Sequence, residues 1–189
     1  MKMAKKFLAV ALAGVLALSV LTGCGDSVKS KDIADSLTKM GVKVEQSKDV
    51  DKTAENTLKA IETIIAADSA NKITLDNAVE KVTGKVISQE HIDDNTDAAN
   101  AVQKALGVFT TGEGAETANK NKQVCVALVK TENATKDASL QAHFVKGNLV
   151  PANANSVTQG KTIVEPGKLG TAKTKDGKYI LVVIINDVK

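Results

Sequence analysis

The stretch YILVVII, residues 179–185, is the most apolar segment of the chain downstream of residue 24. It carries no charged residue, and five of its seven side chains are branched at Cβ. An uninterrupted apolar run of this length is typical of a strand in the middle of a sheet. We therefore predict that residues 179–185 form the central strand of the domain.

The sequence around this run predicts a sheet in the C-terminal half. Residues 169–174, the turn-forming Lys-Asp-Gly-Lys of residues 175–178, and the apolar run together predict a β-hairpin. Pro166-Gly167 predicts a turn just before it. Three further stretches have strand-like apolar patterns: residues 123–130, 140–144 and 161–164.

The first half has the periodicity of helices. Apolar residues recur at three- and four-residue steps in four stretches: residues 31–40, 51–67, 73–83 and 94–106. The clearest is 51–67, for which we predict Asp51 as the N-cap. A short strand is expected at 42–45. Helices followed by strands predict an α+β fold, with N-terminal helices packed on a C-terminal antiparallel β-sheet.

Composition excludes nucleic acid as a partner. The chain has 25 basic residues, all of them lysine, and 22 acidic residues. Three of the lysines lie within the first six residues, so the remainder is close to neutral. Only three aromatic residues follow residue 24: Phe109, Phe144 and Tyr179. A neutral surface without arginine and with so few aromatic side chains does not suit phosphate binding or base stacking.

The N-terminus has the organisation of an export signal. Residues 1–6 are basic, and residues 7–20 form an apolar run of 14 residues. That run is too short to cross a bilayer, which takes about 20 apolar residues. A basic start, a short apolar run and small residues after it are typical of a secretory signal peptide.

Leu21-Thr22-Gly23-Cys24 resembles the lipobox of bacterial lipoproteins. The resemblance implies cleavage between Gly23 and Cys24, a thioether from the Cys24 sulfur to diacylglycerol, and anchoring by fatty acyl chains such as palmitate. The expected organisation is a signal peptide (1–23), a lipidated cysteine with a short tether (24–29) and one domain (30–189). The expected location is the extracytoplasmic face of a cell membrane, inner or outer.

No catalytic residue and no cofactor is predicted from the sequence. Cys125 lies within the apolar residues 124–129, where a free cysteine behaves as a small buried hydrophobe. We expect a non-catalytic envelope domain that binds a protein, a wall polymer or a small molecule, or has a structural role. Lys168, Lys173, Lys175 and Lys178 belong to the predicted hairpin region and are expected to be solvated, with anionic lipid or wall polymer as the alternative contact.

Two alternatives remain open at this point. One is a metal-dependent envelope hydrolase with His91 and His143 as ligands and Glu90 as base. Catalytic zinc usually has three protein ligands, and the chain has only these two histidines and no HExxH motif. The second is a propeptide-like protease inhibitor module, because residues 72–86 (KITLDNAVEKVTGKV) resemble the opening helix of PepSY-type peptidase propeptides.

Overall fold

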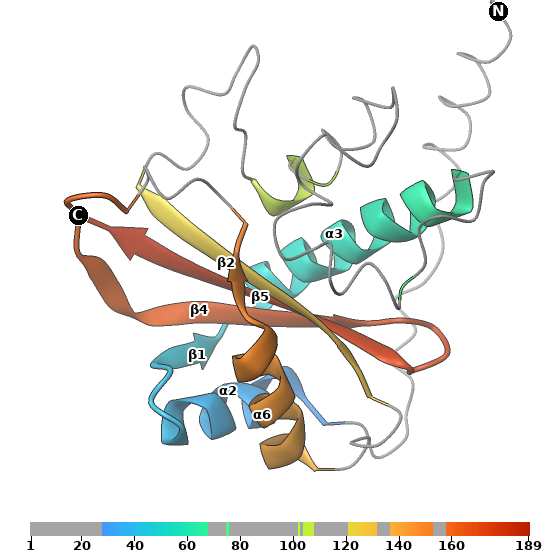
Figure 1. Cartoon of the computed structure of the whole chain (residues 1–189), viewed down its shortest axis with the longest axis horizontal. Coiled ribbons are helices and arrows are strands. Elements are labelled where there is room, and N and C mark those ends of the chain that lie inside the picture. Colours follow the sequence, from blue (N-terminus) through green and yellow to red (C-terminus); the bar gives the residue numbers. More distant parts are fainter. Residues whose placement is uncertain are drawn as a thin grey trace, which may run out of the picture.

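The computed structural model describes residues 28–67, 75, 102, 104–107, 121–131, 137–152 and 158–189. Its helices and strands are shown in Figure 1. In chain order they are α2 (Ser30–Lys39), β1 (Val44–Gln46), α3 (Lys48–Ala67), β2 (Lys122–Lys130), α6 (Ala138–Asn148), β3 (Val150–Pro151), β4 (Ile163–Lys173) and β5 (Tyr179–Val188).

The sheet has five strands in the order β1-β4-β5-β2-β3. The central strand β5 pairs antiparallel with β4 on one side and with β2 on the other. The predicted α+β fold, the hairpin and the central position of YILVVII are therefore confirmed. One edge differs from a purely antiparallel sheet, because β1 pairs parallel with β4, with Val44 opposite Gly167.

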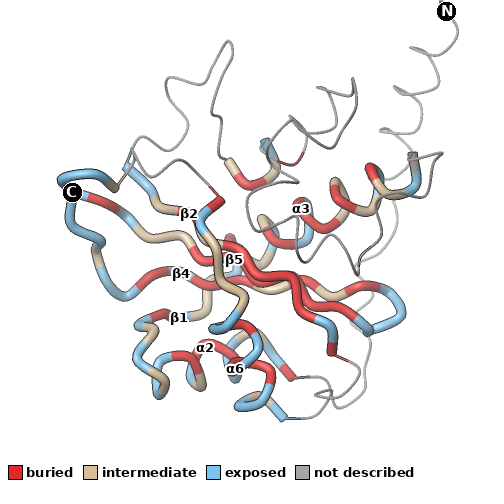
Figure 2. Tube along the Cα trace, viewed as in Figure 1, coloured by how far each residue is buried: buried red, intermediate tan, exposed pale blue. Residues whose placement is uncertain are grey.

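Helices cover both faces of the sheet, α3 on one and α2 with α6 on the other (Figure 1). Alternate residues of β5 therefore enter two separate cores. Leu181 and Val183 pack in the core beneath α3, and Ile180 and Val182 pack in the core beneath α2 and α6. Burial on both faces explains why residues 179–185 of this strand are all apolar, and Figure 2 shows the buried residues running along it.

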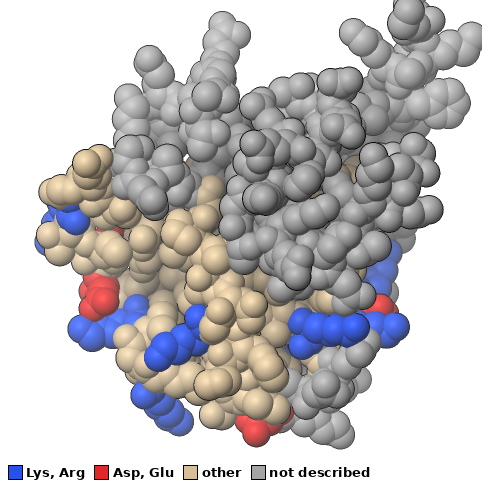
Figure 3. Space-filling view, viewed as in Figure 1, with Lys and Arg blue, Asp and Glu red and all other residues tan. Residues whose placement is uncertain are grey.

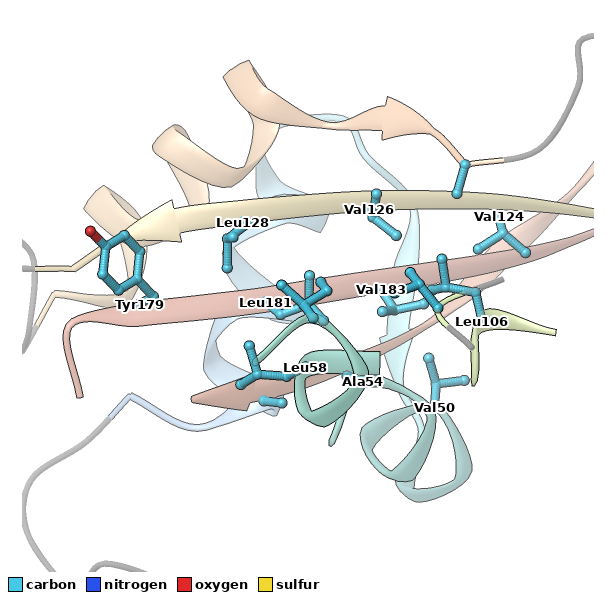
Figure 4. Close-up of a cluster of buried hydrophobic side chains, with 14 of the residues drawn as sticks. Val50, Ala54, Leu58, Leu106, Val124, Val126, Leu128, Tyr179, Leu181 and Val183 are labelled. Carbon is cyan, nitrogen blue, oxygen red and sulfur yellow. The ribbon is translucent and has the colours of Figure 1, made fainter. Parts of the chain in front are cut away.

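The core beneath α3 is drawn in Figure 4. Val50, Ala54 and Leu58 follow the helical three- and four-residue spacing and point toward the sheet. They meet alternate side chains of β2 and β5, which point the same way because a strand has a period of two. Burying each large aliphatic side chain contributes about 1.5–3 kcal/mol, so these contacts hold α3 to the sheet.

Residues 140–144 are helical, and the predicted strand there is wrong. They belong to α6, whose N-terminus is capped by the Asp137 carboxylate, which accepts hydrogen bonds from the backbone N–H groups of Ser139 and Leu140 at 2.8 and 3.1 Å. Gln141 and Val145 are buried at a four-residue spacing. His143 falls within this stretch, so it lies on a helix and not on a strand as the predicted strand 140–144 implies.

The predicted strands 161–164 and 169–174 both overlap a single strand, β4, which begins at Ile163 and ends at Lys173. The Pro166-Gly167 pair lies in a bulge, where the register with β5 shifts between Val164 and Lys168, and the Glu165–Pro166 peptide bond is cis. Gly167 leaves room for the Asn186 side chain, whose oxygen would have to move if position 167 carried a Cβ. The turn signal therefore marks a bulge within a strand.

The first two helices and the first strand follow the prediction closely. The expected helix 31–40 is α2, and the expected strand 42–45 is β1, each within two residues. The helix predicted from Asp51 begins at Lys48, so Asp51 lies in its first turn and is not its N-cap. The predicted helices 73–83 and 94–106 fall mostly outside the described residues, although Leu75, Val102 and residues 104–106 are helical.

Candidate functional site

The chain enters the described domain beside the C-terminal end of β4. Val28 is buried, and its side chain packs in the core beneath α2 and α6. Its carbonyl oxygen accepts a hydrogen bond from the Lys173 ammonium at 2.9 Å. Burial lowers the pKa of Lys173 below its ordinary value. The entry point is thus fixed to the sheet by an apolar contact and by a partly desolvated hydrogen bond.

A polar cluster next to this entry point joins four segments, and we call Ser30, Gln46, Asp51 and Thr171 the Asp51 cluster. One Asp51 oxygen accepts hydrogen bonds from the Ser30 hydroxyl at 2.8 Å and the Thr171 backbone N–H at 2.9 Å. The other accepts from the Gln46 side-chain amide at 2.5 Å. The Ser30 and Thr171 hydroxyls are 2.7 Å apart. Because Ser30 gives its only proton to Asp51, Thr171 is the donor in that contact.

The Asp51 cluster acts as a clamp. Its members come from α2, the end of β1, the first turn of α3, and β4. The Asp51 carboxylate accepts from three donors: the Ser30 hydroxyl, the Gln46 side-chain amide and the Thr171 backbone N–H. The geometry therefore suits the positioning of the N-terminal segment.

Gly170 explains how Asp51 reaches the backbone of the next residue. A Cβ on Gly170 would lie 2.0 Å from the carbonyl carbon of Val50 and 2.1 Å from the backbone nitrogen of Asp51. The first turn of α3 therefore lies directly on the backbone of β4. A glycine inside a strand often marks such a close approach of two backbones.

The turn between β4 and β5, residues Thr174–Lys178, is closed by side chains. The Thr174 hydroxyl donates to the Asp176 carboxylate at 2.6 Å, and the Lys178 backbone N–H donates to the same oxygen at 3.0 Å. These hydrogen bonds, that from Thr174 first, lower the pKa of Asp176. From the adjacent end of β2, the Thr131 hydroxyl donates to the Gly177 carbonyl at 2.5 Å. The turn is thus fixed in shape, and Lys175 and Lys178 are exposed on it.

The predicted anchor residues Gly23 and Cys24 lie outside the described residues, and so do Glu90 and His91 of the hydrolase alternative. His143 lies on α6 and is exposed. Its ring meets the edge of Phe144, with 6.4 Å between the ring centroids. In the described part of the chain, no three His, Cys, Asp or Glu side chains come close enough to hold a metal ion.

Cys125 lies on β2 and is partly buried. It packs against the core beneath α2 and α6, and burial raises the pKa of its thiol to about 11. Reactive cysteines have a lowered pKa, because the thiolate is the nucleophile. These properties match a packing role for Cys125.

Charges of both signs are distributed over the surface. Figure 3 shows lysines, and fewer acidic side chains, scattered across one face of the described domain. Of the four lysines expected around the hairpin, Lys173 is half-buried, whereas Lys168, Lys175 and Lys178 are exposed. Among the described residues, no helix has the length and apolar character needed to span a bilayer.

Comparisons with known proteins return no relative. No protein-family model matches the sequence, and no curated protein or solved structure matches it significantly.

The contacts at the entry point cannot be read from the sequence. The local pattern predicts Asp51 only as a helix cap, and it gives no sign of the Thr171 contact or of the Lys173 contact with Val28. These partners are more than 100 residues apart in sequence, so local patterns carry no information about them. Gly170, a glycine within a predicted strand, was the one local signal that another backbone approaches there.

Proposed function

We propose that this chain is a lipoprotein of the bacterial cell envelope, anchored by acyl chains on Cys24, with a domain that binds a partner or has a structural role and is not catalytic. The observation that carries the proposal is the N-terminal sequence: basic residues 1–6, the apolar residues 7–20 and the lipobox-like LTGC at 21–24. Each buried methylene contributes about 0.8 kcal/mol, so two or more acyl chains give stable anchoring.

The start of the domain supports this proposal. Val28 is already buried and hydrogen-bonded, only four residues after Cys24. Four residues reach at most about 14 Å. An anchor at Cys24 would therefore hold the domain directly at the membrane surface, where envelope proteins, wall polymers and small molecules are the available partners.

The side-chain chemistry of the described residues favours binding or a structural role over catalysis. The Asp51 cluster holds four segments together, the Cys125 thiol has a raised pKa, and His143 is exposed beside Phe144. Nothing in the described part of the chain gives specific support to the hydrolase alternative. The inhibitor alternative rests on residues 72–86, of which only Leu75 is described.

Acylation can be tested with the chain's two cysteines. The full-length protein is expressed in a bacterium fed labelled palmitate, alongside Cys24→Ser and Cys125→Ser variants. We expect label and membrane fractionation for the unchanged protein and for Cys125→Ser, and an unlabelled, unprocessed precursor for Cys24→Ser. Mass spectrometry of the N-terminal peptide should show an acylated cysteine as its first residue. Labelling and processing that survive the loss of Cys24 would refute the proposal.

The absence of metal-dependent activity is tested separately. Zinc is titrated into the mature protein and into a His143→Ala variant, with calorimetric detection. We expect the same weak or undetectable binding for both proteins. Tight binding of one zinc ion that is lost with His143 would instead favour the hydrolase alternative.

A further inference from the structure

The N-terminal segment runs along β4 toward the β4–β5 turn. The Ser30 hydroxyl contacts Thr171, and two residues earlier the Val28 carbonyl contacts Lys173, two residues further along β4. From Ser30 back to Val28, the chain therefore approaches the turn at Thr174–Lys178. Val28, the first residue that the structure describes, therefore lies near this end of the sheet.

Chain lengths decide which end of the domain lies near an anchor at Cys24. The four residues between Cys24 and Val28 span at most about 14 Å. From Lys173, the turn extends the hairpin by about two residues, or about 7 Å, which is within that reach. The other end of β4, at Ile163, is ten residues away from Lys173, or roughly 30 Å. A tether of this length keeps the hairpin end close to the membrane.

The exposed charge at the turn suits an anionic surface. Lys175 and Lys178 are exposed on a turn whose shape is fixed by Thr174 and Asp176. The Asp176 carboxylate accepts two hydrogen bonds within the turn, and the Lys178 ammonium lies 3.9 Å from it. Glu62 of α3 is the other described acid that interacts with this turn, and it is partly buried.

We propose that the domain stands on the membrane with its β4–β5 turn facing the bilayer, so that Lys175 and Lys178 contact the phosphates of anionic phospholipids. This orientation rests on the lipid anchor proposed above. Each lysine held at an anionic leaflet strengthens the contact about fivefold. The two lysines therefore orient a domain that the acyl chains already hold.

The orientation is tested with the full-length lipoprotein in vesicles that carry a spin label on the lipid headgroup. In a Cys125→Ser background, a fluorophore is attached to a single cysteine introduced by Lys175→Cys. The matched control is Gln159→Cys, in the turn that precedes β4 at the opposite end of the sheet. We expect at least threefold stronger quenching at position 175 than at 159. Equal quenching, or stronger quenching at 159, would overturn the orientation.

The lipid contact is tested by comparing vesicles of neutral phosphatidylcholine with vesicles that contain 30% phosphatidylglycerol. Because the label replaces Lys175, only Lys178 of the two lysines remains, and through it quenching at position 175 should rise about twofold in the anionic vesicles. The rise should disappear in Lys178→Gln and persist in Lys161→Gln, which removes one positive charge at the far end of the sheet. Equal quenching in both vesicles would overturn the headgroup contact.

A failure of the lipid anchor and a failure of the orientation give different experimental results. If the protein does not sediment with either kind of vesicle, both the anchor and the orientation are refuted. If it sediments and the two labels are quenched equally, the anchor stands and only the orientation is refuted.

Discussion

The Asp51 carboxylate accepts a hydrogen bond at 2.9 Å from the backbone N–H of Thr171, a residue 120 positions further along the chain. The same carboxylate oxygen accepts from Ser30 in α2. One side chain thereby ties the N-terminal helix and the first turn of α3 to the hairpin strand that the sequence places near the C-terminus. The hydrogen bonds of Asp51 therefore contribute to the stability of the domain and also fix where its N-terminal segment lies.

Replacement of Asp51 by alanine should destabilise the domain by about 2–3 kcal/mol. The Thr171 N–H and the Ser30 hydroxyl would lose their acceptor, and a hydrogen bond to a charged group is worth about 1.5–3 kcal/mol. Urea unfolding followed by circular dichroism measures the change. Asp49→Ala is the matched control, because Asp49 is an exposed acid in the same helical turn and its loss should cost about 0.3–1 kcal/mol. Similar losses for the two variants would contradict the clamp.

The central part of the fold could be predicted because its signals are local. The apolar run 179–185 and the Lys-Asp-Gly-Lys turn before it are contiguous in sequence, and they form the hairpin as expected. The parallel pairing of β1 with β4 could not be predicted. It joins Val44 to Gly167 at one edge of the sheet, and the pairing of a three-residue strand leaves no pattern in either partner.

The stretch 140–144 was misassigned because five residues are too few to separate the two periodicities. Phe144 and Leu140 are exposed on α6, so their apolar character does not mark the buried face. The informative residue is Asp137, which caps the helix just before the stretch. For the candidate site, the sequence identified Asp51 and the hairpin lysines as individual residues, but their partners depend on tertiary contacts.

Two glycine-to-alanine substitutions should change the stability of the domain in opposite directions. In Gly170→Ala the new methyl group would overlap the backbone of Val50, which no side-chain rotation relieves, so we expect a loss of about 3 kcal/mol or more. In Gly147→Ala the methyl group enters open space on α6, and helix propensity should stabilise the domain by about 0.5–1 kcal/mol. Melting temperatures of the two variants check both signs. A neutral Gly170→Ala variant would mean that α3 does not rest on β4.

Alanine substitutions at Leu181 and Phe144 test which of these two apolar side chains lies in the core. Leu181 is 0% exposed in the middle of β5, and Leu181→Ala should cost about 2–5 kcal/mol. Phe144 is 39% exposed, so Phe144→Ala should cost less than about 1 kcal/mol despite the larger side chain. Chemical denaturation of both variants gives the comparison. A larger loss at Phe144 than at Leu181 would contradict the observed packing of α6.

The Cys125 thiol predicts how stability changes in alkali. Its pKa is about 11 in the folded protein, against an ordinary value of 9.0. Between these two pH values the unfolded chain loses the proton that the folded chain retains, so the free energy of unfolding falls as pH rises. Two pKa units correspond to about 2.7 kcal/mol, reached once the pH exceeds 11.

The measurement compares urea unfolding of the unchanged protein and of Cys125→Ser at pH 8 and at pH 11. The two proteins differ only at position 125, so the difference between the two pH-dependent losses isolates the thiol. We expect the unchanged protein to lose about 2 kcal/mol more than the variant. The rate of alkylation of Cys125 at pH 8 provides a second readout. Alkylation should be at least about tenfold slower in the folded protein than in the urea-unfolded protein. Equal alkylation rates in the two states would show that packing against α2 and α6 does not protect the sulfur.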